Sequence, residues 1–179
     1  MNPVEAALLA MLSMHDGSGR YYLAKLSGLG EGFIRDRLKN LREQGLIVTK
    51  RSGNYLTEKG MEKLNEYLNS LGIARLYSID LSPIFKDKYL SCLIAVTKRG
   101  INDVVRARDE LIRHGCKAAI IMHNECSEIA IPMTPFKLRD LNNELNQRLK
   151  NISSCGDTLI GVCGDNEFIN VMAILSTSG

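Results

Sequence analysis

The stretch from Leu23 to Thr57 decides the first half of the fold, and its sequence is LAKLSGLGEGFIRDRLKNLREQGLIVTKRSGNYLT. Within it, Ile34, Leu38 and Leu41 recur at positions i, i+4 and i+7, which places one apolar stripe along a helix. Gly45 follows the last apolar turn, where a glycine can adopt the left-handed conformation that ends a helix. The stretch therefore predicts a helix over residues 31–44.

A β-hairpin is expected directly after this helix. Residues 46–49 (Leu-Ile-Val-Thr) have the composition of a strand, and residues 51–54 (Arg-Ser-Gly-Asn) that of a turn. Tyr55 and Leu56 can form the returning strand, so the predicted hairpin covers residues 46–56. Thr57 can then cap a further helix that runs to about Leu71.

The start of the chain predicts another helix. Asn2 can act as its N-cap, Pro3 is favoured at the first helical position, and Glu5 completes a capping box. This helix should reach about Met14, and a shorter helix should follow over residues 21–26. The predicted order of the first half is thus three helices, a hairpin and a fourth helix.

The excess of positive charge lies in the part of the chain that contains the helix over 31–44 and the hairpin. Residues 20–57 contain 8 Lys and Arg against 3 Asp and Glu, a net charge of +5, whereas residues 76–179 contain 12 of each. Any one of these charges is typical of a solvated helix surface. Their gathering on one helix face and one hairpin tip favours contact with nucleic-acid phosphates.

Two segments, GEGFIRDRLKNLREQGLI (30–47) and YLTEKGMEKL (55–64), resemble the winged helix-turn-helix domains of many bacterial and archaeal transcription regulators. The shared features are L-x-x-L-x-x-x-G-L-I, a basic hairpin and L-T-x-x-G, over about the first 70 residues. The resemblance implies a recognition helix 31–44 in the major groove and a wing 46–56 on the backbone or minor groove. The DNA-binding residues that we expect are Arg35, Asp36, Arg37, Lys39, Arg42, Lys50, Arg51 and Asn54. Gly32 and Phe33 depart from the small polar residues that are common at the start of such a helix.

The second half of the chain alternates between strand and helix patterns. We place a DNA-binding domain at residues 1–72, a linker at 73–88 in which 76–81 could form a strand, and a second domain at 89–179. The second domain is expected to dimerise and to sense an effector. Its predicted strands are 89–97, 118–123, 128–132, 157–162 and 168–175, and its predicted helices are 101–114 and one that starts at 134–135 and reaches 149.

This order predicts an α+β fold. A ferredoxin-like βαββαβ unit with one extra strand accommodates it, because right-handed crossovers place both helices on one face of an antiparallel sheet. A winged helix joined to such a unit is similar in element order to the leucine-responsive regulator family, whose C-terminal domain dimerises and senses amino acids. No residue motif of that family is present, so its ligand is not carried over.

The cysteines and histidines give no strong sign of chemistry. Five cysteines without close paired spacing favour free thiols in a reducing compartment. A metal site is not expected, because the nearest candidates lack a standard zinc spacing: His114, Cys116, His123 and Cys126. The repeated tripeptides Cys155-Gly156-Asp157 and Cys163-Gly164-Asp165 favour turns over an anion-binding nest. His15, in a loop, is expected to be solvated.

The remaining observations narrow the class of protein. No run approaches the roughly 18 apolar residues of a membrane span, and the start lacks the basic region of a signal peptide, so a cytoplasmic location is expected. No nucleotide-binding or hydrolase motif occurs, and we expect neither an enzyme nor a cofactor. The leading hypothesis is a homodimeric transcription regulator that binds double-stranded DNA and a small-molecule effector. The alternatives are a winged-helix protein-interaction module, or a small-molecule-binding protein or enzyme that uses the second domain.

Overall fold

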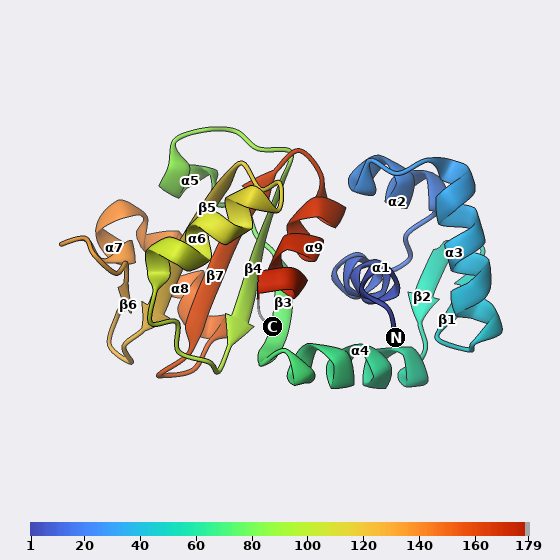
Figure 1. Ribbon diagram of the computed structural model, residues 1–179, viewed down its shortest axis with the longest axis horizontal. Helices are drawn as coiled ribbons and strands as arrows, with labels where there is room; N and C mark the ends of the chain where they lie inside the picture. Colours follow the sequence, from blue (N-terminus) through green and yellow to red (C-terminus); the bar gives the residue numbers. More distant parts are fainter. Residues whose placement is uncertain (178–179) are drawn as a thin grey trace.

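The first half of the molecule is helical except for one hairpin, as the computed structural model, which describes residues 1–177, shows (Figure 1). The helix predicted over 31–44 and the hairpin predicted over 46–56 are confirmed. The elements are α1 (Pro3–Met14), α2 (Arg20–Ser27), α3 (Glu31–Glu43), β1 (Ile47–Lys50), β2 (Gly53–Leu56) and α4 (Glu58–Ser70).

Local sequence explains where these helices begin and end. The Asn2 side chain accepts a hydrogen bond from the Glu5 backbone, which forms the predicted capping box of α1. The Thr57 hydroxyl caps α4 by accepting from the Gly60 amide at 3.0 Å. Gly45, which follows the C-cap residue Gln44 of α3, has a φ of +71°, a conformation that glycine adopts without a steric penalty.

The second half forms one antiparallel sheet of five strands in the order β3-β4-β7-β5-β6. Helices lie on both of its faces (Figure 1). The elements are β3 (Ile73–Ser78), α5 (Ser82–Phe85), β4 (Ser91–Thr97), α6 (Val104–Arg113), β5 (Ala118–Asn124), β6 (Ile129–Ala130), α7 (Leu138–Leu141), α8 (Asn143–Ile152), β7 (Thr158–Gly164) and α9 (Glu167–Thr177).

The alternation of β4 separates the two faces. Leu93 belongs to the apolar cluster that includes Leu111 of α6, whereas Ile94 belongs to the cluster that includes Leu145 of α8. The prediction of both helices on one face is therefore wrong. If both crossovers, β4-α6-β5 and β6-α8-β7, were right-handed, this strand order would place α6 and α8 on the same face. Because the two helices lie on opposite faces, the two crossovers have opposite hands. The face that α6 covers also holds α9, which leaves the other face for α8.

The predicted ferredoxin-like arrangement also differs from the observed strand order. The four strands of the expected βαββαβ unit lie in the order β4-β7-β5-β6, so the second and fourth of them are central. A ferredoxin-like sheet has its first and third strands at the centre. The coarser prediction, an α+β fold with an antiparallel sheet, is confirmed.

Two segments have a different structure from the one expected. Residues 168–175, predicted as a strand, belong to α9, which is apolar on most sides because it packs between the sheet and α1. Periodicity does not distinguish such a buried helix from a buried strand. Residues 73–88, predicted as a linker, contain β3 and α5, and β3 supplies the fifth strand by pairing with β4.

The helical half and the sheet share one apolar cluster. In Figure 1, α9 lies between the sheet and α1, and α4 runs from the hairpin to β3. Every residue from Ala6 to Leu12 is fully buried, because α1 contacts the hairpin and α4 as well as α9. The apolar surface of α1 is therefore covered by both halves of the molecule.

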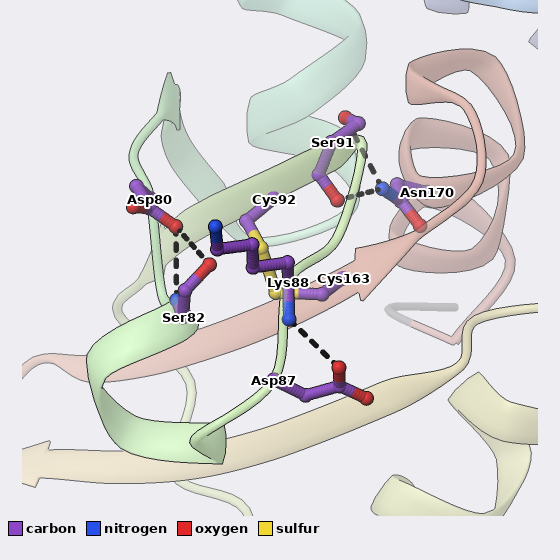
Figure 2. Close-up of a disulfide and its surroundings, with 8 residues drawn as sticks. All are labelled: Asp80, Ser82, Asp87, Lys88, Ser91, Cys92, Cys163 and Asn170. Carbon is purple, nitrogen blue, oxygen red and sulfur yellow. Dashed lines mark hydrogen bonds between the residues drawn. A yellow bond between two sulfur atoms is a disulfide. The ribbon is translucent and has the colours of Figure 1, made fainter.

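Four of the five cysteines form disulfides, so the prediction of free thiols is wrong for them. Cys92 and Cys163 are register partners on β4 and β7 and are joined across the sheet (Figure 2). Cys126 and Cys155 join the β5–β6 turn to the segment before β7. Cys116 remains a thiol, and its burial raises its pKa to about 12. The partners are 71 and 29 residues apart, and only the strand and turn arrangement brings them together.

None of the helices in residues 1–177 has the length and the apolar character that crossing a membrane requires.

Candidate nucleic-acid interface

A groove of about 630 Å³ lies between α3 and the β1–β2 hairpin. Six basic side chains and one acidic side chain contribute to its lining. The basic residues are Arg20, Arg35, Lys39, Arg42, Lys50 and Arg51, and the acidic one is Asp36. The structure thus brings five of the predicted basic residues to one groove, which we call the basic groove.

Helix α3 supplies one wall of the basic groove. Ile34, Leu38 and Leu41 are buried, which turns Arg35 and Lys39 outward. Arg35 Nε lies 3.4 Å from Asp36 Oδ1, and Lys39 Nζ lies 3.8 Å from Glu43 Oε1. All four side chains of these pairs are more than 60% exposed, and such ion pairs contribute little to stability. Both cations can therefore exchange their partners for phosphate oxygens at low cost.

The tip of the hairpin supplies the opposite wall. Lys50 and Arg51 are exposed, and Lys50 Nζ lies 5.0 Å from the centre of the Tyr55 ring. Gly53 has a φ of +138°, and a Cβ atom there would overlap the backbone of Gly17. This close backbone contact fixes the hairpin against the loop that follows α1.

Asn54 has a structural role at this contact. Its side chain is buried, and Nδ2 donates to the Ser18 carbonyl oxygen at 2.9 Å. Its Oδ1 accepts a hydrogen bond from Thr49 Oγ1 at 2.8 Å. Asn54 borders the groove, but both polar atoms of its side chain are engaged within the protein. The prediction of Asn54 as a DNA contact is therefore not supported by its surroundings.

Two further arginines differ from expectation. Arg37 does not line the basic groove, and its guanidinium carbon lies 5.0 Å from the centre of the Phe33 ring. Arg20, at the start of α2, does line it, although the sequence did not single this residue out. Its position near the hairpin depends on the packing of α2 against α3, and no local pattern encodes that packing.

The predicted candidates for metal and anion chemistry are separated or engaged elsewhere. Cys126 is joined to Cys155, and His123 Nδ1 lies 3.0 Å from Thr158 Oγ1. Among the described residues, no group of three or more His, Cys, Asp or Glu side chains could hold a metal ion. Asp157 accepts a hydrogen bond from the Ser154 amide and pairs with Lys98 Nζ at 2.8 Å, so it stabilises a turn.

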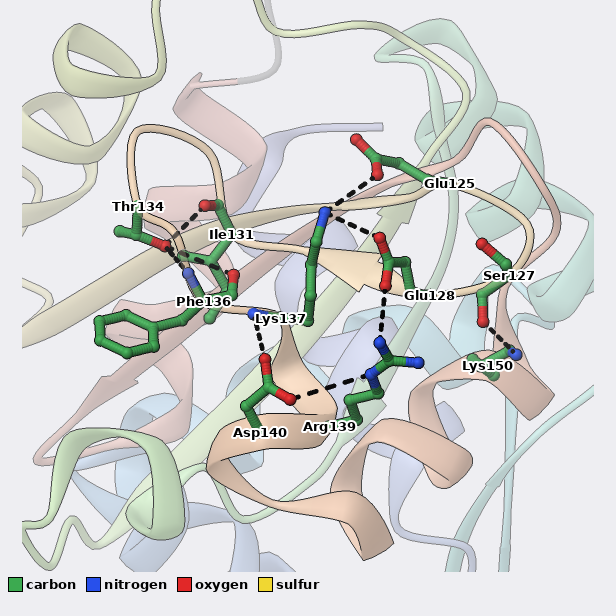
Figure 3. Close-up of polar contacts among 10 residues, drawn as sticks. All are labelled: Glu125, Ser127, Glu128, Ile131, Thr134, Phe136, Lys137, Arg139, Asp140 and Lys150. Carbon is green, nitrogen blue, oxygen red and sulfur yellow. Dashed lines mark hydrogen bonds and ion pairs between the residues drawn. The ribbon is translucent and has the colours of Figure 1, made fainter.

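A charged cluster at the far end of the sheet is internally compensated. Lys137 Nζ lies 2.8 Å from Glu128 Oε1 and 3.5 Å from Glu125 Oε2, and Arg139 also approaches Glu128 (Figure 3). Lys137 additionally forms a β-bridge with Ala130. These contacts fix the 131–137 loop against β6, and their opposite charges leave no net attraction for a charged ligand.

The expectation of a solvated His15 is wrong. Its Nε2 lies 2.8 and 3.0 Å from the two carboxylate oxygens of Glu167, whose side chain is only 2% exposed. The hydrogen bond to Glu167, together with the attraction of that carboxylate, raises the pKa of His15 against the opposing effect of burial. The two residues are 152 positions apart, and no local pattern indicates that they pair.

Comparison with known proteins establishes the fold and no function. No protein-family model matches the chain, and no curated protein matches it. A solved structure, the hypothetical protein PH0730 from Pyrococcus horikoshii OT3, is similar with a TM-score of 0.73 and 22% identity. The similarity covers 98% of this chain and 90% of that one, so the whole α+β arrangement has a counterpart.

Proposed function

We propose that the protein is a DNA-binding transcription regulator whose basic groove contacts a DNA duplex. The observation that carries the proposal is the composition of this groove, in which six basic side chains and one acidic side chain come from α3, the hairpin and the first residue of α2. DNA presents a dense row of phosphates, and binding by Lys and Arg is driven largely by the release of counterions.

The arrangement of the elements suits a winged helix-turn-helix. Helix α3 has 13 residues, and its exposed face carries Arg35 and Lys39. The major groove of DNA admits one α-helix, where arginine and lysine can donate to guanine edges. We infer that Lys50 and Arg51 contact the phosphate backbone beside it, as the tip of a wing does. Two copies would present their α3 helices to successive major grooves about 34 Å apart.

A salt titration of DNA binding tests the proposal. Fluorescence anisotropy with a labelled duplex would compare the wild type with Arg35→Ala and Lys50→Ala over a range of salt concentrations. Arg148→Ala, at an exposed arginine of α8, is the matched control. We expect log K to fall linearly with log[salt], and Lys50→Ala to reduce the slope by about 1. The stoichiometry at saturation would test the dimer.

The same experiment can overturn the proposal. A slope near zero for the wild type would show that no phosphate contacts form. Equal losses of affinity in Arg148→Ala and Lys50→Ala would show that the basic groove has no special role.

A further inference from the structure

A second cavity, of about 270 Å³, lies at the junction between the helical half and the sheet. Its walls come from the residue after α1, from α2, from the end of β3 and the segment after it, from the start of β4 and the segment before it, and from the first residue of α9. They include two carboxylates, Asp80 and Glu167, two tyrosines, Tyr22 and Tyr89, and His15. No lysine or arginine of the described chain lines this cavity, which we call the junction cavity.

The lining favours a small organic cation. The Glu167 carboxylate is almost completely buried, and a buried carboxylate requires a positive or hydrogen-bonding partner. Asp80 Oδ1 accepts hydrogen bonds from the amide and the hydroxyl of Ser82, which lower the pKa of Asp80 and keep it ionised (Figure 2). Aromatic faces such as those of Tyr22 and Tyr89 attract cations and also pack against apolar groups.

A chain of hydrogen bonds connects the junction cavity to the hairpin. It begins at the Glu167 carboxylate, which pairs with the His15 side chain. The backbone carbonyl oxygen of His15 accepts a hydrogen bond from Ser18 Oγ at 2.6 Å. The Ser18 carbonyl oxygen in turn accepts from both the amide and the side chain of Asn54, at 3.0 and 2.9 Å. Asn54 then accepts from Thr49 on β1. A change at Glu167 can therefore reach the wall of the basic groove through one loop, residues 15–19.

We propose that the junction cavity binds a small arylalkyl ammonium ion, which replaces His15 as the partner of Glu167 and so releases the 15–19 loop from α9. The ammonium group would pair with Glu167 and Asp80, and the apolar body would pack between the tyrosines and Leu26. The expected effect on DNA affinity rests on the proposed DNA-binding function. The binding of the cation does not.

Exchange of partners gives this proposal a distinctive pH dependence. A protonated His15 competes with the guest for Glu167. The other titratable groups around His15 are its neighbour in the chain Asp16, Tyr22 on α2, and Asp80 and Tyr89 on the cavity wall. When the pH rises, His15 loses its proton, while an alkylamine with a pKa of about 10 stays charged. The guest should therefore bind more tightly at higher pH.

Isothermal titration calorimetry with 2-phenylethylamine tests the chemistry of the guest. The matched probes are 2-phenylethanol, which is neutral, and phenylacetate, which is an anion of similar shape. At pH 8.5 we expect the amine to bind at least tenfold more tightly than the alcohol, and the acid not to bind. Between pH 6 and pH 8.5 the affinity for the amine should rise at least threefold. Equal binding of amine and alcohol, or an affinity that does not rise with pH, would overturn the proposal.

Variants test the place of binding. Asp80→Asn should weaken the amine at least fivefold, whereas Asp87→Asn should change its affinity less than twofold. Asp87 is an exposed carboxylate of the same connection between β3 and β4 that does not line the cavity. Glu167→Gln should abolish binding, with circular dichroism to check its fold. Because Asp80 is exposed, Asp80→Asn keeps the test valid if Glu167→Gln fails to fold. Equal effects of Asp80→Asn and Asp87→Asn would overturn the proposal.

DNA titrations with and without the amine separate the two proposals. We expect saturating amine to change the DNA affinity of the wild type at least threefold. If the amine binds and the DNA affinity stays the same, the link through residues 15–19 is wrong. If no DNA binds in the absence of the amine, the proposed function is wrong. The calorimetry then still tests whether the junction cavity binds the amine.

Discussion

His15 and Glu167 form a polar contact between the helical half and the sheet half of the molecule. His15 lies directly after α1 and is 19% exposed, whereas Glu167 is the first residue of α9 and is 2% exposed. Loss of the imidazole would leave a buried carboxylate without its partner, which costs more than the hydrogen bond itself contributes. At the scale of residues, this pair is where the solution pH should act on stability.

We expect His15→Gln to destabilise the protein more at pH 6 than at pH 9. The folded state raises the pKa of His15 above its ordinary value of 6.5, so the stabilisation is fully present below about pH 6.5 and is lost as the pH rises through the folded-state pKa. Urea denaturation at both pH values should show a difference in the effect of the substitution of about 1 kcal/mol. His114→Gln, at an exposed histidine, is the control. An effect of His15→Gln that is the same at both pH values would contradict this account.

At the scale of elements, α4 lies in tight contact with Leu46, which connects α3 to the hairpin. Gly60 is buried in the first turns of α4, and a Cβ atom at this position would overlap the carbonyl oxygen of Leu46. The same oxygen accepts a hydrogen bond from the Thr57 amide at 3.0 Å. The position of the hairpin relative to α4 thus depends on the absence of one side chain.

A pair of glycine substitutions tests this contact. Gly60→Ala should destabilise the protein by roughly 2 kcal/mol, because α4 must move away from Leu46. Gly32→Ala is the matched control, since Gly32 lies in α3 with open space around it. It should stabilise the protein by about 0.5–1 kcal/mol, because alanine favours the helix. Denaturant melts measure both. Gains in stability from both substitutions would show that the Leu46 contact is not tight.

At the scale of the whole molecule, the helical half and the sheet are held by one continuous core. The apolar cluster that contains α1 also contains Leu93 of β4, Leu111 of α6 and Ile174 of α9. Neither half buries α1 without the other. The two halves should therefore unfold together.

Hydrogen exchange tests this cooperativity. Leu93→Ala, at a fully buried residue of the sheet, should cost about 2–5 kcal/mol. We expect the slowest amides of α1 to lose the same free energy of protection as those of β4. Leu90→Ala, at a side chain that is 83% exposed, should leave both unchanged. Protection in α1 that survives Leu93→Ala would show that the halves unfold separately.

The sequence alone determined the elements that have one buried face and clear ends. Helix α3 is the best example, because Ile34, Leu38 and Leu41 follow a single period and Gly45 ends it. The same stripe predicts which side of α3 is exposed. Arg35 and Lys39 lie on that side, and both line the basic groove. Local hydrogen-bonding and periodicity rules suffice for such features.

The tertiary structure decided what depends on distant partners. The sequence pattern of α9 does not distinguish a helix from a strand, because the helix is covered on most sides. The strand order, and the placement of α8 on the face opposite α6 and α9, depend on contacts between segments far apart in the chain. Three side chains depend on such contacts in particular. Arg20 lines the basic groove, the Asn54 side chain bonds to Ser18, and Cys92 forms a disulfide with Cys163. The His15–Glu167 pair was hidden for the same reason. A sequence pattern records the side chains of one segment, whereas burial and pairing depend on the other segments that pack against it.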